Sequence, residues 1–314
     1  MTLTELKYIV ALAREKHFGR AADACFVSQP TLSVAIKKLE EELSVSLFER
    51  GSNEVSLTPV GERIVVQAQR VLEEASAIKA IAQQGMDPLA GPLRVGVIYT
   101  IGPYLLPGLV SSMIERVPSM PLVLQENFTV RLLELLKQGE IDVAVLALPI
   151  NESGFVIQPL YDEPFMVALP KSHKWANEKT IRSDDLRSEN MLLLGTGHCF
   201  RDQVLGVCPE LSRFSQSSEG IQRTFEGSSL ETIRHMVASG VGITVLPSSS
   251  VPNPVPKESL LTYIPLADDD TRRTVALVWR KSFSRREAIE ALRDAIMECS
   301  LNGVEFLDSP QMVR

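Results

Sequence analysis

The spacing of apolar residues changes abruptly at Gly85-Met86-Asp87-Pro88-Leu89-Ala90-Gly91-Pro92, and this change limits the possible folds most. Before this segment the sequence predicts helices in quick succession, and after it strand-like and helical runs alternate. Helices packed on helices and helices packed on a sheet are different layer architectures, so we expect separate domains. The chain of 314 residues is long enough for two or three. We expect a helical module over residues 1–58, a linker helix and hinge over 59–90, and an α/β domain over 91–314.

Composition excludes several classes of protein. The chain is 45% hydrophobic and 23% charged, which is typical of a soluble globular protein. No apolar run approaches 18 residues, so a membrane span is not expected. The first residues lack a basic segment followed by an apolar stretch, so we expect a cytoplasmic protein and no secretion signal. Four cysteines in 314 residues are too few for a disulfide-stapled scaffold.

The amino-terminal helices have a pattern that suits DNA recognition. Ser28 can cap a helix that has Pro30 in its first turn. Its apolar residues follow a spacing of four, three and four: Leu32, Ile36, Leu39 and Leu43. The opposite face carries Pro30, Thr31, Ser33, Val34, Lys37 and Lys38. Short polar residues followed by lysines are typical of a helix that enters the DNA major groove.

A hairpin is expected to follow this helix. Residues 45–50 and 54–57 are strand-like and flank the turn sequence Gly51-Ser52-Asn53. This order predicts a winged helix-turn-helix, and the alternative is a small three-helix bundle with a solvated polar face. The net charge of −7 does not favour nucleic-acid binding, and residues 1–82 hold 10 Lys and Arg against 11 Asp and Glu. Any DNA binding must therefore depend on local placement of charge.

The next segment predicts one long helix over residues 59–84. Its apolar residues alternate in steps of four and three: Ile64, Ala68, Val71, Ala75, Ile78 and Ala82. Such a heptad seam favours a dimer helix. The alternative is an amphipathic helix packed on its own domain.

Beyond the hinge, strands are expected over 93–99, 122–126, 141–148, 191–194, 242–246 and 274–279. Helices are expected over 103–116, 130–138 and 228–239, the last opened by a capping box from Ser228 to Glu231, and the alternation predicts a parallel-rich sheet in two lobes.

Several spaced motifs resemble the LysR-type transcriptional regulators. They are Arg20-Ala21-Ala22-Asp23, Val27-Ser28-Gln29-Pro30-Thr31-Leu32-Ser33, Ile36-Lys37-Lys38-Leu39-Glu40, Leu47-Phe48-Glu49-Arg50 and Leu57-Thr58-Pro59-Val60-Gly61. The resemblance implies a winged helix-turn-helix, a long linker helix and a two-lobed, periplasmic-binding-protein-like α/β effector domain. It also implies binding of double-stranded promoter DNA and action on RNA polymerase. The candidate DNA-binding residues are Ser28, Gln29, Pro30, Thr31, Ser33, Lys37 and Arg50.

A loop further on resembles the redox loop of peroxide-sensing members of that family. It reads Gly197-His198-Cys199-Phe200-Arg201-Asp202-Gln203 and then Gly206-Val207-Cys208. The resemblance implies that hydrogen peroxide oxidises Cys199 and that Cys208 then closes a disulfide. It further implies a homotetramer built as a dimer of dimers, activation of antioxidant genes, and reset by a cellular dithiol reductant. Cys25 and Cys299 match no part of the motif.

The residues themselves make the two cysteines a candidate switch. A thiolate attacks peroxide, and nearby positive charge or a helix amino end favours it. If residues 200–207 are helical, the two α-carbons are about 13 Å apart, whereas a disulfide requires roughly 5.5 Å. Oxidation would then force the segment to unwind. The alternatives are that sulfenic acid alone is the signal or that Cys199 is a loop cysteine of no consequence.

Two threonines are expected at strand carboxyl ends facing helix amino termini, where open α/β sheets bind ligands. Thr100 and Thr129 could orient peroxide, helped by His198, Asp202 and either Arg272 or Arg273; singly, each threonine could be only a helix cap.

His17, His173 and His235 lack metal-ligand spacing with the cysteines, so no metal or cofactor is expected. Two other functions remain open: a LysR-type regulator that senses a small organic effector in the crevice between the lobes, and a thiol peroxidase, which a DNA-binding module disfavours.

Overall fold

The structure is a computed structural model that describes residues 1–50, 55–84, 89–208, 224–227, 229–268 and 271–307. The chain divides into two compact units, Met1–Pro88 with Ser282–Ser284 and Leu89–Lys281 with Arg285–Arg314. The predicted turn at 51–53 and part of the predicted hinge lie outside the described residues. No helix among those ranges combines the length and the apolar character that a bilayer-spanning segment needs.

The first unit is a winged helix-turn-helix. It contains α1 (Leu3–Glu15), α2 (Phe18–Ala24), α3 (Gln29–Leu43) and the antiparallel strands β1 (Phe48–Arg50) and β2 (Val55–Leu57). Thr2 and Glu5 form the capping box of α1, and the Ser28 side chain accepts from the Thr31 N–H at the start of α3. The buried face of α3 consists of Leu32, Ile36 and Leu39, which pack with α1 and α2 in one core. The fold predicted for this region is confirmed.

The long helix α4 (Pro59–Gln84) completes this unit. Its first turns belong to the core of the unit, because Ala68 is 3% exposed and Ile64 packs against the same cluster. Val71 and Ile78 are 37% and 69% exposed. Ala68 is therefore a correction to the predicted dimer seam, since its own domain already covers it. The side chain of Ala82 lies outside what the structure describes.

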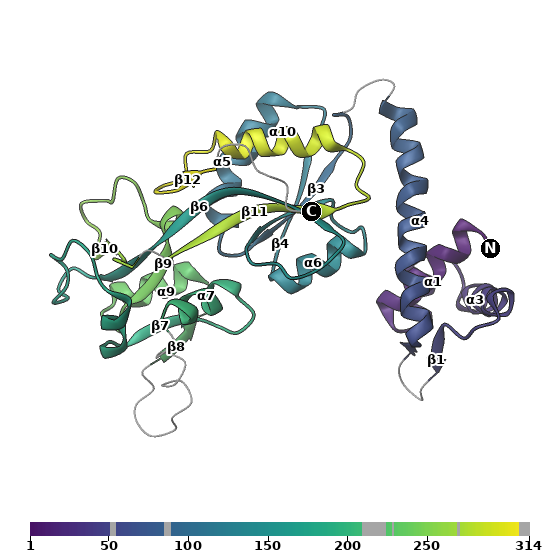
Figure 1. Ribbon diagram of the computed structural model, residues 1–314, viewed down its shortest axis with the longest axis horizontal. Coiled ribbons are helices and arrows are strands. Elements are labelled where there is room, and N and C mark those ends of the chain that lie inside the picture. The colour runs from purple at the N-terminus through teal and green to yellow at the C-terminus, as the bar shows by residue number, and fades with distance from the viewer. Residues whose placement is uncertain (51–54, 85–88, 209–223, 228, 269–270, 308–314) are drawn as a thin grey trace. The chain divides into compact units, whose positions relative to one another are not determined.

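The second unit begins with a lobe built on a mixed sheet (Figure 1). Strand β3 (Leu93–Ile98) pairs in parallel with β4 (Leu122–Asn127) and β5 (Val143–Ala147). Strand β11 (Arg272–Arg280) lies antiparallel between β5 and the sixteen-residue β6 (Phe155–Pro170). Helices α5 (Gly102–Arg116) and α10 (Arg286–Met297) pack together on one side of this sheet, and α6 (Thr129–Lys137) covers the other.

Strand β6 continues into a second lobe. There it pairs with β9 (Thr244–Pro247) and β10 (Leu261–Pro265), and β12 (Glu305–Phe306) pairs with its other half. A parallel pair, β7 (Met191–Leu194) and β8 (Thr224–Gly227), lies with helices α7 (Cys199–Val207) and α9 (Leu230–Ala238). The short 3₁₀ helix η1 (Ser183–Ser188) lies between β6 and β7, and η2 (Ser248–Ser250) lies between β9 and β10. The lobe has its own hydrophobic core, which includes Phe200, Val204 and Cys208 of the α7 segment.

Two sequence-based expectations for this unit are wrong in part. The sheet is not parallel-rich, because β6, β9, β10, β11 and β12 all pair antiparallel. Strand β6 was not expected, since its mixture of buried and half-buried residues lacks the strict alternation of an ordinary strand. Helix α9 is capped by Ser229, which accepts from the Thr232 N–H, and the expected cap Ser228 lies outside the described residues.

Candidate functional site

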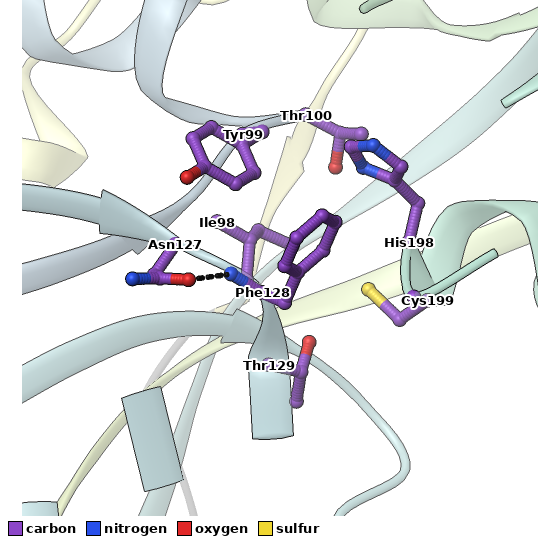
Figure 2. Close-up of a pocket in the computed structure, with 9 residues that line it drawn as sticks. Ile98, Tyr99, Thr100, Asn127, Phe128, Thr129, His198 and Cys199 are labelled. Carbon is purple, nitrogen blue, oxygen red and sulfur yellow. Dashed lines mark hydrogen bonds between the residues drawn. The ribbon is translucent and has the colours of Figure 1, made fainter. Parts of the chain in front are cut away.

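Three chain segments meet in a small pocket at the carboxyl ends of β3 and β4 (Figure 2). The pocket is lined by Ile98, Tyr99, Thr100, Asn127, Phe128, Thr129, Gly197, His198 and Cys199. Ile98 is the last residue of β3 and is followed by Tyr99 and Thr100; the next three residues join β4 to α6, and the last three open α7. The pocket has room for about one water-sized molecule. Four of the predicted site residues, Thr100, Thr129, His198 and Cys199, are therefore brought together.

Cys199 is the first residue of α7, and its thiol is free and half-buried. Figure 2 shows its sulfur pointing toward Phe128 and Thr129 rather than away from the pocket. The Cys199 sulfur therefore lines the pocket at the amino end of α7.

Aromatic rings form one wall of the pocket. The rings of Phe128 and His198 lie 4.9 Å apart, those of Tyr99 and Phe128 5.2 Å, and those of Tyr99 and His198 6.0 Å, all edge to face. His198 is buried. Because these rings cover one side of the pocket, the polar side-chain groups that a small molecule meets on the other sides are chiefly the threonine hydroxyls and the cysteine sulfur.

The two threonines enter the pocket from opposite sides (Figure 2). The Thr129 hydroxyl is buried and has no hydrogen-bond partner among the residues that the structure describes. The Thr100 hydroxyl accepts a hydrogen bond of 2.8 Å from Nη1 of Arg273, so its own proton remains available for donation. A buried polar group without a partner is costly. A small molecule that hydrogen-bonds to Thr129 would therefore satisfy a group that the protein leaves unsatisfied.

Behind Thr100 lies a buried ion pair. Arg273 Nε donates to Glu163 Oε2 at 2.7 Å, and both side chains are 0% exposed. The same guanidinium donates to the Thr100 carbonyl at 3.1 Å and lies 5.1 Å from the ring centre of Phe200 in α7. The Glu163 carboxylate also accepts from the Ser249 N–H at 2.9 Å. Arg273 therefore holds Thr100 in place while contacting residues of both lobes.

The other two predicted pocket residues lie elsewhere. Arg272 precedes Arg273 on β11 and is exposed, because successive side chains of a strand point to opposite faces. Asp202 is exposed on α7, three residues beyond Cys199. Neither lines the pocket. Of the two arginines that the sequence left open, the structure turns Arg273 inward.

Cys208 ends the same helix in a different environment. It is the C-cap of α7, is 6% exposed, and its Sγ donates to the Ser183 carbonyl at 3.2 Å. Burial, and then the nearby Asp268 and Asp184 carboxylates, raise the pKa of Cys208 to about 12. Both thiols are free. The full length of α7 separates them, about 13 Å between α-carbons at the rise of an α-helix.

Direct side-chain contacts join the two lobes near the pocket. The Tyr104 hydroxyl of α5 donates to Glu231 of α9 at 2.8 Å, and Gln203 of α7 donates to the Leu148 carbonyl at 3.0 Å. The Arg273 contacts to Thr100 lie beside these bonds. The orientation of α7 is thereby coupled to the first lobe.

The candidate DNA-reading face of α3 is open. Ser28, Gln29, Pro30, Thr31 and Lys37 are exposed, Ser33 is half-buried, and Lys37 Nζ lies 3.7 Å from Glu41 of the next turn. The side chain of Arg50 lies outside the described part of the chain. Sequence reasoning missed Phe26, which has a positive φ of 57° and is 95% exposed beside this face.

The aromatic residues of the pocket were also missed, as was Glu163. A signal was available, because Tyr99 and Phe128 each stand one residue before a predicted threonine. In the described portion of the chain, no three His, Cys, Asp or Glu residues are grouped so that they could hold a metal ion. The cysteine pair is therefore the main candidate for chemistry.

Comparisons with known proteins agree with this architecture. Residues 3–62 match the bacterial regulatory helix-turn-helix proteins of the lysR family, and residues 87–299 match the LysR substrate binding domain. The chain is 42% identical over 296 residues to the DNA-binding transcriptional dual regulator OxyR of Escherichia coli K12, covering 94% of this chain and 95% of that protein.

Solved structures extend the similarity. A full-length OxyR cysteine variant from Pseudomonas aeruginosa has a TM-score of 0.78 and 52% identity, covering 96% of this chain and 99% of that one. A hydrogen-peroxide-bound OxyR cysteine mutant from Corynebacterium glutamicum has a TM-score of 0.63 and 34% identity, covering 95% and 92%. With both of its domains matched and the similarity extending over nearly all of its length, the chain belongs to the LysR family of transcriptional regulators.

Proposed function

We propose that this protein is a transcriptional regulator that responds to hydrogen peroxide through Cys199. The observation that carries the proposal is the buried Thr129 hydroxyl, which has no partner among the described residues, in a small pocket lined also by Cys199. Hydrogen peroxide is small, donates and accepts hydrogen bonds, and reacts with thiolates. The relatives named as OxyR, one of them with peroxide bound, support the same signal.

The first chemical step is oxidation of Cys199. Its thiolate attacks one peroxide oxygen, the O–O bond breaks, and the second oxygen leaves as hydroxide. The sulfur loses two electrons and becomes sulfenic acid. Thr129 forms a hydrogen bond with the bound peroxide, as donor or acceptor. Thr100, held by Arg273, donates a hydrogen bond to it. His198 shapes the wall beside the sulfur.

The second step joins Cys199 to Cys208. A disulfide needs α-carbons roughly 5.5 Å apart, and the intact α7 keeps them about 13 Å apart. The helix must therefore unwind, which withdraws Phe200 and Val204 from the core of the second lobe and Gln203 from the Leu148 carbonyl. This rearrangement of the regulatory domain changes DNA binding and activates antioxidant genes. A cellular dithiol reductant restores the thiols.

The remaining parts of the proposal concern assembly and DNA. The face formed by Ser28, Gln29, Pro30, Thr31, Ser33, Lys37 and Arg50 reads promoter DNA. Regulatory domains and α4 hold a homotetramer, built as a dimer of dimers, in which the cytoplasmic regulator contacts RNA polymerase. The protein acts by stoichiometric oxidation rather than as a peroxidase that turns over.

Mapping the thiols by alkylation and mass spectrometry tests the proposal. Reduced protein is alkylated before and after one equivalent of hydrogen peroxide, and the oxidised sample is expected to contain a Cys199–Cys208 bridge with Cys25 and Cys299 still free. Both thiols remaining alkylatable, while promoter binding responds to a small organic metabolite, would instead support an effector-binding regulator. Retention of Cys199 sulfenic acid with full promoter response and no bridge would make the sulfenic acid itself the signal.

The variant Cys199→Ser separates sensing from DNA binding. It removes the nucleophile and leaves the helix-turn-helix unchanged, so we expect ordinary promoter affinity and no induction by peroxide. A reporter strain and a gel shift measure the two properties. Peroxide induction that persists in this variant would remove Cys199 from the mechanism.

A further inference from the structure

We propose that Asp268 is a positioning residue for the disulfide step: through Ser183 it holds Cys208 in a closed socket and thereby sets how fast oxidised Cys199 is resolved. This inference rests on the proposed function, because it concerns the thiol that resolves the sulfenic acid. The socket is defined as the Ser183 carbonyl, the Asp268 carboxylate and the core side chains around Cys208.

Two consecutive hydrogen bonds link Asp268 to Cys208. Asp268 Oδ2 accepts from the Ser183 N–H at 2.7 Å, and the carbonyl of that same Ser183 accepts from Cys208 Sγ at 3.2 Å. Ser183 is therefore held by Asp268 through its N–H, and it holds Cys208 through its C=O. Asp268 fixes the first residue of η1, and the position of η1 fixes the resolving thiol.

The segments that carry these two residues are tied to each other. The Ala267 N–H donates to the Ile181 carbonyl at 2.9 Å, and the Ile181 N–H donates to Pro265 at 3.1 Å. The Thr271 hydroxyl donates to the Asp268 carbonyl at 2.6 Å. The socket is thus part of the sheet edge of the second lobe, whereas Cys208 lies at the end of a nine-residue helix. When the pair separates, the helix end is the side that moves.

The electrostatic surroundings keep Cys208 protonated. Its side chain is 6% exposed and belongs to the core cluster of the lobe. Asp268 and Asp184 both raise the pKa of Cys208, after burial itself. Arg182 is the nearby cation: it lies 3.9 Å from Asp184 and lowers the pKa of Asp268, after the Ser183 hydrogen bonds. A neutral thiol is a poor nucleophile, so Cys208 has to leave the socket before it attacks.

How readily Cys208 leaves the socket determines which of two reactions oxidised Cys199 undergoes. In resolution, the Cys208 sulfur attacks the sulfenic sulfur, an S–S bond forms, the S–O bond breaks, and the thiol proton leaves with the hydroxyl as water. In the competing reaction, a second peroxide oxidises sulfenic acid to sulfinic acid, which the dithiol reductant does not restore. A tighter socket therefore favours the second outcome and a looser socket the first.

The socket can be tested without peroxide. In a full-length Cys199→Ser background, Asp268→Ala is expected to increase the rate of Cys208 alkylation by iodoacetamide about tenfold at pH 7. Asp185→Ala is the matched control, because it removes an acidic side chain from η1 itself, whereas the Ser183 N–H donates to Asp268. Equal alkylation rates in Asp268→Ala and Asp185→Ala would overturn the socket.

Asp268→Asn distinguishes positioning from a general loss of structure. Its side-chain oxygen still accepts from the Ser183 N–H, so alkylation at pH 7 should stay within about twofold of the parent. Its negative charge is lost, so a rate close to the parent's would assign the effect of Asp268→Ala to the lost hydrogen bond rather than to the lost charge. An Asn variant as reactive as the Ala variant at pH 7 would contradict the inference.

Single-turnover oxidation then tests the role in resolution. With Cys199 restored and one equivalent of hydrogen peroxide, Asp268→Ala should convert sulfenic acid to disulfide about tenfold faster, with Cys199 oxidised at the parental rate. Rapid quenching with dimedone, which traps sulfenic acid, measures both steps. If the parent forms the disulfide and Asp268→Ala does not form it faster, the inference about Asp268 is refuted while the proposed function stands. Absence of the disulfide in the parent refutes the proposed function and, with it, any role of the socket in resolution.

Discussion

At the scale of single residues, one helix gives its two terminal cysteines opposite properties. Cys199 opens α7 half-buried, with its side chain lining the pocket that also holds Thr129. Cys208 closes the helix among apolar side chains, with two carboxylates nearby that raise its pKa. The first thiol is therefore arranged to react with an external oxidant and the second to wait as a neutral group.

The unpartnered Thr129 hydroxyl leads to a prediction about peroxide. Thr129→Val keeps the shape of the side chain but removes the hydroxyl, so oxidation of Cys199 should slow at least tenfold, as expected for loss of a positioned hydrogen-bonding group. Stopped-flow measurement with hydrogen peroxide gives the rate. The melting temperature should not fall, because the lost hydroxyl has no partner among the described residues. A parental rate in this variant would separate Thr129 from peroxide binding.

The raised pKa of Cys208 predicts how stability changes with pH. Because the folded-state pKa, about 12, exceeds the unfolded value, about 8.5, the buried neutral thiol contributes its full stabilisation below pH 8.5. That contribution is lost as pH rises toward the folded value, by about 1.4 kcal/mol per pH unit. Urea unfolding of reduced protein at pH 7 to 10 should show a steeper loss in the parent than in Cys208→Ala. Parallel curves would show that Cys208 ionises equally readily in both states.

At the scale of elements, α7 combines a short length with a weak point. A nine-residue helix is not stable alone, so contacts of Phe200, Val204 and Gln203 must hold it. Gly206 lies exposed in its last turns, and a β-carbon there would meet open space. Glycine lowers the stability of a helix interior by about 1 kcal/mol relative to alanine, which favours unwinding.

Gly206→Ala should therefore make the disulfide easier to reduce. Stabilising the helical, reduced state by about 1 kcal/mol raises the midpoint potential by about 20 mV. Titration against glutathione buffers measures this potential. Gly108→Ala in α5 is the control, because it is another exposed helical glycine whose added carbon would make only an ordinary contact with Cys299. Equal potentials in the two variants would mean that α7 does not unwind on oxidation.

The α3 face supports a prediction about DNA. Lys37 is exposed and its nearest charged partner is Glu41, so the ammonium group can reach a phosphate or a base edge. Lys37→Ala should weaken promoter binding five- to tenfold and lower the salt dependence by about one phosphate contact. Fluorescence anisotropy at several salt concentrations measures both. Lys257→Ala removes the same charge from the regulatory unit, and an equal effect there would show that only net charge matters.

At the scale of the whole molecule, the sequence predicted local structure better than tertiary pairing. The bounds of α4 and β7 and the buried face of α3 follow from periodicity, which neighbouring residues determine. The antiparallel pairing of β6 with β9, β10 and β11 depends on segments up to 125 residues apart, since Phe155 pairs with Arg280. Periodicity carries no information about such partners.

The same limit explains what was missed at the pocket. Thr100 and Thr129 could be predicted because each follows a strand, but the choice between Arg272 and Arg273 needed the register of β11 against β6. Glu163 becomes the partner of Arg273 through that register, which pairs the two residues directly. Likewise, the burial of Ala68 in its own domain depends on how α4 packs against α1.

The corrected seam of α4 gives a prediction about assembly. Ala68 is covered within its own unit, but Val71 and Ile78 remain exposed with heptad spacing, and large exposed apolar residues on a helix favour pairing. Ile78→Asp would place a charge in that interface while leaving the fold of a single chain intact, because the residue is 69% exposed. Sedimentation velocity at micromolar concentration should show a shift to smaller species and weaker binding to a two-half-site promoter. Val66→Asp alters an equally apolar residue, 55% exposed on the same helix but off the seam, and should leave assembly unchanged. Equal assembly in both variants would place the dimer contact outside the α4 seam.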